Sequence, residues 1–219
     1  MISKLSAAAL FTAFASLSAF APSALKNKIE KQENIRPYIY SGTAESIFKV
    51  DNATSKVTWL SKKATSDHDG QIKLSSGQLL VENSVLKGGN FEIDMNTISC
   101  DDVTDAKSNE KLLNTLKNES FFNTVKFPKA SFVITSAKKT SGSQYLIKGK
   151  LTIKGITNDS SFPATISIAD KKLNAVAKIV FDRTKFDIKY SSKNFFENLG
   201  DKAIYDNVDI TVNLNAVAP

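Results

Sequence analysis

The chain has 219 residues, of which 42% are hydrophobic and 23% charged, and it carries a formal net charge of +7. This length and composition predict one globular domain with a sizeable core, or at most two small ones. The single cysteine, Cys100, excludes an intramolecular disulfide, and with only one histidine, His68, we predict no zinc or other metal site. The lysines alternate with apolar residues, as on solvated strand faces, and no nucleic-acid motif accompanies them, so we predict no nucleic-acid partner.

The first residues predict an exported protein. Lys4 precedes an apolar run over residues 5–20 that is too short and too rich in small residues to span a membrane comfortably. Ala19-Phe20-Ala21 fits the small-x-small pattern of a cleavage site. We therefore predict a signal peptide over residues 1–21, a charged linker over residues 22–46, and a periplasmic or secreted location for the domain that follows.

From residue 47 onward apolar residues recur with a period of two, which is typical of strands with one buried face. Before residue 100 this pattern predicts strands around residues 57–62, 72–81 and 91–95, and Gly77 is the expected place for a bulge in the second. Between the first two strands, the Asp69-Gly70 pair predicts a turn.

A short helix and an aromatic segment follow. The helix is predicted over Ser108–Glu119, with Ser108 as its N-cap and three leucines on one side. Residues 121–132, which we call the aromatic joint, hold four of the chain's fourteen phenylalanines. Pro128 cannot donate a ladder hydrogen bond, so the next strand should begin after it. The joint is interpreted either as a hydrophobic plug that closes one end of a core, or as the mouth or wall of an apolar ligand cavity.

The second half of the chain alternates almost throughout. Turns are predicted at residues 141–143 and 155–159, a loop over residues 191–201, and strands at residues 130–135, 145–154, 161–168, 173–181, 186–190 and 208–216. Eight or more half-apolar strands with short turns predict an all-β fold, in which an antiparallel sheet closes into a barrel of about eight strands. The inner face mixes large residues such as Phe91 with small ones such as Ala175, which favours room for a ligand but also fits a filled, tapering barrel.

Few residues suggest chemistry. Asp67-His68-Asp69 resembles an acid/base or metal cluster, but adjacent residues on a strand point to opposite faces and converge poorly. Asp182 and Arg183 are expected to form an ion pair at a barrel end. No nucleophile elbow, phosphate-binding loop or metal-helix motif is present in the sequence. We therefore predict no catalytic residue, no cofactor and no enzymatic activity.

In order and spacing, five segments of this chain resemble the YceI-like family, the lipocalin-like polyisoprenoid-binding domain. They are Phe48–Asp51, Ser55–Trp59, Gly89–Met95, the aromatic joint with the helix before it, and Gly149–Thr157. The resemblance covers residues 48–216 and implies an extended barrel around a long apolar tunnel. It also implies that the tunnel holds an isoprenoid chain, such as a quinone tail or a polyprenyl phosphate, and that the family has no catalytic residues.

The resemblance and the inferred inner faces together predict an exported protein that stores or transports an isoprenoid lipid or quinone in the cell envelope. The sequence leaves open whether the protein also contacts a membrane surface and whether it forms a homodimer. The alternatives are a ligand-free envelope stress or interaction protein with a filled barrel, and an enzyme that modifies a lipid or a quinone. The residues predicted to bind the lipid are Trp59, Phe91, Ile93, Met95, Phe121, Phe122, Phe132, Ile134, Tyr145, Ile147, Leu151, Phe181, Phe186 and Tyr190.

Overall fold

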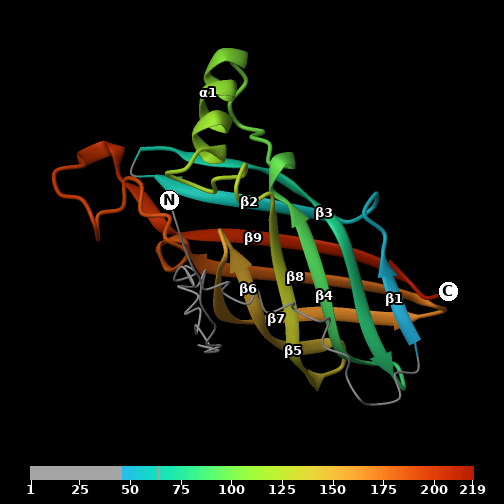
Figure 1. Cartoon of the computed structure of the whole chain (residues 1–219). Helices are drawn as coiled ribbons and strands as arrows, with labels where there is room; N and C mark the ends of the chain where they lie inside the picture. The colour runs from blue at the N-terminus through green and yellow to red at the C-terminus, as the bar shows by residue number, and fades with distance from the viewer. Residues whose placement is uncertain (1–45, 64) are drawn as a thin grey trace, which may run out of the picture. The chain divides into compact units, whose positions relative to one another are not determined.

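The computed structural model describes residues 46–63 and 65–219. The predicted signal peptide and all but the last residue of the predicted linker lie outside the described residues. The described part consists mainly of nine strands, one α-helix and three 3₁₀ segments (Figure 1). In chain order these are β1 (Ser46–Val50), β2 (Lys56–Lys63), β3 (Asp67–Glu82), β4 (Val85–Asp94), η1 (Met95–Thr97), α1 (Ala106–Lys117), β5 (Lys129–Ser141), β6 (Gln144–Ile153), β7 (Ile156–Ala169), β8 (Lys172–Asp182), η2 (Arg183–Phe186), η3 (Gly200–Lys202) and β9 (Ile204–Val217).

The strands form one antiparallel sheet that closes on itself. Their order is β1-β3-β2-β9-β8-β7-β6-β5-β4, and pairing of β3 with β4 joins the two sides. The first half of β3 pairs with β2 and its second half with β1, while β9 pairs with both β2 and β1. The two short strands thus share one position between β3 and β9, and the ring has eight positions. The predicted barrel of about eight strands is confirmed.

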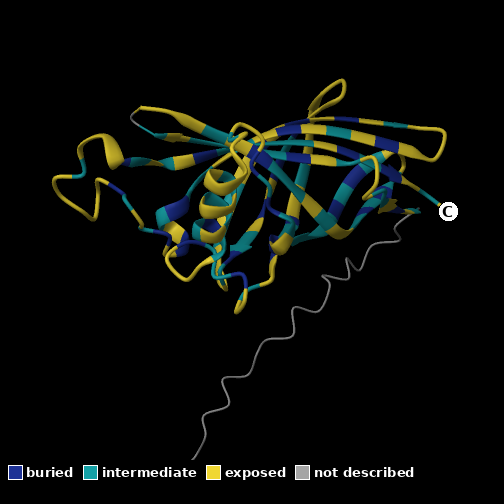
Figure 2. Cartoon of the chain, turned by 90° about the horizontal axis from the view of Figure 1, so that it is seen from above, coloured by how far each residue is buried: buried dark blue, intermediate teal, exposed yellow. Residues whose placement is uncertain are grey.

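Buried and exposed positions alternate along much of the barrel's strands (Figure 2). In β6, Tyr145 and Ile147 are buried, whereas Lys148 and Lys150 are exposed. The same alternation in β8 buries Leu173 and exposes Asn174. This one-sided burial is the physical reason why the period of two in the sequence indicated most of the strands.

The helix begins earlier than the sequence predicted. Asp105, not Ser108, is the N-cap of α1, and its carboxylate accepts a hydrogen bond from the backbone N–H of Ser108 at 2.9 Å. Both residue types cap helices well, so the sequence alone did not decide between them. Among the described residues, no helix is both long enough and apolar enough to cross a membrane.

Two local predictions before β9 are wrong. Asp69 and Gly70 lie inside β3 rather than in a turn, and a Cβ atom at Gly70 would overlap the carbonyl oxygen of Ser99. Glycine is therefore needed there for close approach of another backbone, not for reversal of the chain. Residues 186–190 form no strand, because Asp182 caps the turn η2 and Asp187 has a left-handed φ of 57°.

Three further local predictions are correct or nearly so. β5 begins at Lys129, directly after Pro128, as expected. The bulge expected at Gly77 lies instead at Ser75, because the pairing of β3 with β4 shifts between Leu74 and Ser76 while Gly77 pairs regularly with Phe91. The predicted turn at residues 155–159 is shorter in the structure, because Lys154 and Gly155 take φ values of 53° and 75° and β7 already starts at Ile156.

Candidate ligand cavity

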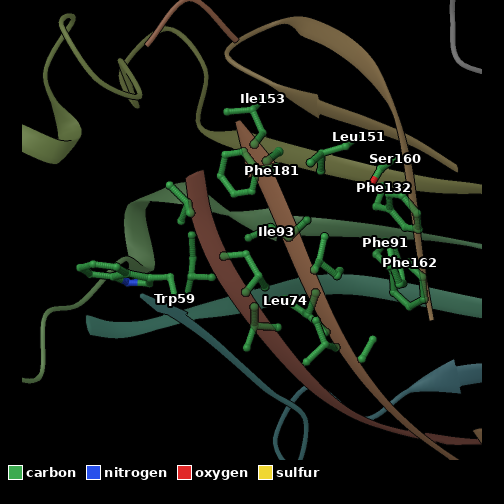
Figure 3. Close-up of a pocket in the computed structure, with 18 of the residues that line it drawn as sticks. Trp59, Leu74, Phe91, Ile93, Phe132, Leu151, Ile153, Ser160, Phe162 and Phe181 are labelled. Atoms are coloured by element: carbon green, nitrogen blue, oxygen red, sulfur yellow. The ribbon is translucent and has the colours of Figure 1, made fainter. Parts of the chain in front are cut away.

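The barrel encloses an elongated cavity of about 230 Å³ (Figure 3). Leu173, Ala175, Ala177, Ile179 and Phe181 all line it from one strand, β8. These eight steps along the strand correspond to roughly 26 Å at about 3.3 Å per residue. The lining thus extends along most of β8, and a long, slender cavity of this kind suits a chain better than a compact molecule.

The wall of the cavity is almost wholly apolar. Among the described residues, the polar ones that line it are Ser61, Ser160 and Arg183. The Arg183 guanidinium is engaged elsewhere, because it donates to the carbonyl oxygens of Tyr205, Ile188, Tyr190 and Ile204 at 2.8–3.1 Å. It also forms a salt bridge with Asp206 at 3.0 Å rather than with Asp182, the partner expected from the sequence. Arg183 therefore fastens η2 and the following loop to β9, and the channel itself offers little to a polar ligand.

The most deeply buried residues of the interior form two clusters, one toward each end of the barrel. One buried cluster surrounds Phe48, Leu86 and Leu173, and the other surrounds Trp59, Met95 and Phe121. Between them runs a belt of inward-facing residues that are only half buried, although they point away from bulk solvent. We call this set the belt: Leu74, Phe91, Ile93, Phe132, Leu151, Ile179, Phe181, Ile210 and Val212.

The belt argues against the filled-barrel alternative. A packed interior would bury inward-facing side chains as completely as it buries Leu86, which is 1% exposed. Phe132 instead contacts Phe162 with a ring separation of 5.4 Å and leaves another part of its surface toward the cavity. The empty space is thus concentrated where aromatic and branched aliphatic side chains from different strands face each other (Figure 3).

The structure brings most of the predicted lipid-binding residues together around this cavity. Those that line it are Trp59, Phe91, Ile93, Met95, Phe121, Phe122, Phe132, Ile134, Ile147, Leu151 and Phe181. Three predicted residues do not. Tyr145 is 2% exposed within the packed end cluster, and Phe186 packs edge-on against Phe181 outside the lining. Tyr190 is 44% exposed, and its ring lies 5.3 Å from that of Phe121 at a tilt of 46°.

Sequence reasoning also missed part of the wall. Ile72 and Leu74 of β3, Ile179 of β8, and Ile210 and Val212 of β9 line the cavity but were not chosen. Their period-two pattern indicates inward-facing positions, but alternation alone does not tell which inward positions border a cavity. Closure of the barrel decides which alternate positions face the space, so aliphatic residues contribute as much of the wall as aromatic ones.

A small polar cluster lies beside the Trp59 end of the barrel. His68 of β3 places its Nδ1 2.8 Å from Oδ2 of Asp102, and the Cys100 thiol donates to Oδ1 of Asp102 at 3.0 Å. The sequence predicted no such meeting of the single histidine and the single cysteine, because nothing local indicates that residues 98–102 fold back on β3. Burial, followed by the hydrogen bond to Asp102, raises the pKa of the Cys100 thiol.

The carboxylate at the centre of this cluster is held in its charged form. Burial acts to raise the pKa of Asp102, but hydrogen bonds from Cys100, from the Asp69 backbone N–H and from His68 outweigh it. Together these donors lower the pKa of Asp102 to about 2. Asp102 is therefore an anion at neutral pH that gathers two side chains around it.

Comparison with known proteins places the fold in a family. A family model described as the YceI-like domain matches residues 48–216, most of the chain. The chain belongs to the YceI-like family. This YceI-like chain is 29% identical over 102 residues to the UPF0312 protein plu2095 of Photorhabdus laumondii, which is 47% of this chain and 51% of that protein. It therefore spans about half the length of this curated relative.

Two solved structures share the fold of the YceI-like chain at low sequence identity. Burkholderia cenocepacia BcnA superposes with a TM-score of 0.62 at 22% identity, covering 76% of this chain and 98% of that one. A polyisoprenoid binding domain from Saccharophagus degradans, implicated in plant cell wall breakdown, gives 0.60 at 14% identity, with coverage of 78% and 98%. At these identities the likeness concerns the fold.

Proposed function

We propose that this protein holds an isoprenoid-type lipid, either a polyprenyl chain or the tail of an isoprenoid quinone, inside the barrel. The observation that carries the proposal is the narrow apolar cavity bounded by the half-buried belt. The family match supports it, as does the fold shared with a domain whose name states polyisoprenoid binding. We further propose that the protein works as an exported carrier or store in the cell envelope, in keeping with the predicted signal peptide.

Burial of the tail supplies the binding free energy in this proposal. Removing apolar surface from water contributes about 0.8 kcal/mol per CH₂ group, so each prenyl unit contributes several kcal/mol before the cost of ordering it. A wall with so few polar groups discriminates poorly between tails of similar shape. The head group stays near the Trp59 end, where Lys62 and Lys63 of β2 are available to an anionic head.

The same end is proposed to meet the membrane from which the lipid comes. Val125 in the aromatic joint is 94% exposed, and Phe195 and Phe196 in the loop before η3 are each 49% exposed. The two loops are joined by the contact between Phe121 and Tyr190. Exposed large apolar side chains on loops beside a lipid cavity are suited to insertion among lipid head groups.

Vesicle flotation with phosphatidylglycerol-containing liposomes tests this contact. Replacing Phe195 and Phe196 with Ser should reduce the fraction of protein that floats, whereas Val180→Ser, an exposed apolar residue on the outer face of β8, should not. Equal flotation of all three proteins would contradict the proposed contact and leave tail binding untouched.

Lipid binding itself is tested by isolating the full chain from its native cells and extracting it with organic solvent. Mass spectrometry should find a prenyl lipid near one molecule per chain. Ala175→Trp fills the cavity and should abolish the lipid, while Val176→Trp, on the outside of the same strand, should retain it. An extract free of prenyl lipid would refute the proposal.

N-terminal sequencing of the same preparation tests export. An intact Met1 on the isolated protein would contradict removal of a signal peptide.

A further inference from the structure

Three chemically different side chains converge where the segment between η1 and α1 crosses β3. They are the imidazole of His68, the thiol of Cys100 and the carboxylate of Asp102, and their ligand atoms all lie within 4.8 Å of one another. Asp102 contacts both partners, at 2.8 Å from Nδ1 of His68 and 3.0 Å from Sγ of Cys100. A single cation bound by these three atoms would replace the two hydrogen bonds that now connect His68 and Cys100 to Asp102.

The backbone around this cluster is held from both sides. The backbone N–H groups of Ser99 and Asp101 donate to the carbonyl oxygens of Gln71 and Asp69 at 2.9 and 2.8 Å, so the crossing segment continues the hydrogen bonding of β3. Gly70 permits this approach, because any Cβ atom there would overlap the Ser99 carbonyl. The backbone positions that carry the three ligand side chains are therefore set by the fold.

Helix α1 adds a further support behind the cysteine. The Asn109 side-chain amide donates to the carbonyl oxygens of Cys100 and Val103 at 2.9 and 2.8 Å. The Asp69 backbone N–H donates to Oδ1 of Asp102 at 3.0 Å and orients the carboxylate. Groups that hold ligands from outside in this way are typical of metal centres, where they fix the ligand orientation.

The geometry points to a divalent-metal site formed by His68, Cys100 and Asp102, suited best to Zn²⁺. Nitrogen, sulfur and carboxylate oxygen are the three donor types that zinc accepts, and three protein ligands leave a fourth position for water or another small ligand. A thiolate and a carboxylate together balance the charge of a divalent ion. The Cys100 side chain is buried, but His68 and Asp102 are 30% and 28% exposed, so an ion has access from solvent. The site is independent of the lipid proposed for the cavity.

Cobalt(II) serves as a visible substitute for zinc in the test. Metal-free, reduced full-length protein should bind about one Co²⁺ and develop thiolate-to-cobalt charge-transfer absorption, which Zn²⁺ then displaces. Trp59, the single tryptophan of the chain, donates its Nε1–H to the Ser99 carbonyl at 3.1 Å and lies beside the site. Paramagnetic Co²⁺ should therefore quench its fluorescence.

Four variants separate a metal site from adventitious binding. Cys100→Ser should remove the charge-transfer band and weaken Zn²⁺ binding by about 100-fold or more, while His68→Gln and Asp102→Asn should each weaken it by at least about tenfold. Asp101→Asn is the matched control, because its carboxylate accepts from Gln71 and Ser99 instead and should leave affinity unchanged within about threefold.

The His68→Gln variant separates loss of metal binding from loss of folding. His68 is partly exposed, so His68→Gln should keep the wild-type circular dichroism and thermal midpoint and still lose affinity. Wild-type protein that shows no thiolate band, or that binds Zn²⁺ no more tightly than Cys100→Ser, would overturn the proposal. Equal losses in Asp101→Asn and Asp102→Asn would do the same, since they would indicate general attraction to acidic residues.

Discussion

Phe132 and Leu86 both line the cavity, yet their surroundings differ. Leu86 is 1% exposed in the packed end cluster, whereas Phe132 is half buried in the belt. A truncation in a packed region leaves a new hole and loses many contacts, while a truncation in the belt enlarges a space that already exists. The unfolding free energies of the two alanine variants therefore report which part of the barrel is hollow.

We predict that Leu86→Ala lowers the free energy of unfolding of delipidated protein by about 2–5 kcal/mol, as is usual for buried leucines. Phe132→Ala should lower it by less than the roughly 3–5 kcal/mol typical of a buried phenylalanine, although it removes more atoms. Affinity for a prenyl chain should fall in Phe132→Ala. Urea unfolding and lipid titration measure both quantities, and a larger stability loss in Phe132→Ala than in Leu86→Ala would indicate a filled belt.

At the scale of single elements, the sequence predicted strands better than their ends. Alternation identified the long strands because one face of each is buried, but residues 186–190 show the same spacing without forming a strand. There Phe186 and Ile188 are buried by a turn that Arg183 fastens to β9, a contact with residues far along the chain. The approach of residues 98–102 to β3 depends in the same way on Gly70 and on Asn109, so the His68–Cys100–Asp102 cluster could not be predicted locally.

The start of α1 provides a test at this scale. Hydrogen bonds from Ser108, including its backbone N–H, lower the pKa of Asp105, so the charged carboxylate is the form that caps the helix. A group whose pKa is depressed by folding stabilises the folded state above its ordinary value of 3.8, and this contribution disappears as pH falls through the lowered value. We predict that Asp105→Ala speeds amide hydrogen exchange in the first turn of α1 at neutral pH.

Asp105→Asn is the matched control for this prediction, since asparagine caps helices but does not titrate in this range. Its first turn should exchange nearly as slowly as that of the wild type, and the protection should not weaken as the pH is lowered below about 4. Exchange of Asp105→Ala at the wild-type rate would contradict the prediction. It would mean that Ser108 or water replaces the cap, and that the Asp105 carboxylate contributes little to the stability of the first turn.

At the scale of the whole barrel, closure could be predicted but its details could not. Many half-apolar strands with short connections have few ways to avoid exposed edges, and a closed antiparallel ring is one of them. That β1 and β2 share a single position, so that β3 spans both, depends on the register between distant segments. Because β1 continues the position of β2, the barrel is longer than β2 alone would allow. The buried cluster around Phe48 lies at the β1 end.

The length of the cavity leads to the last prediction, which concerns a series of quinones with tails of increasing length. Because tail burial dominates, each added prenyl unit should tighten binding to delipidated protein by roughly tenfold, or about 1.4 kcal/mol, once the cost of ordering the tail is subtracted. The gain should stop when the belt is filled.

Ala175→Phe should move this plateau to a shorter tail, and Val176→Phe on the outer face should not. Quenching or enhancement of Trp59, which lines the cavity, follows the titration. An affinity that does not depend on tail length, or that collapses in His68→Ala, would mean that a polar site rather than the apolar channel holds the ligand.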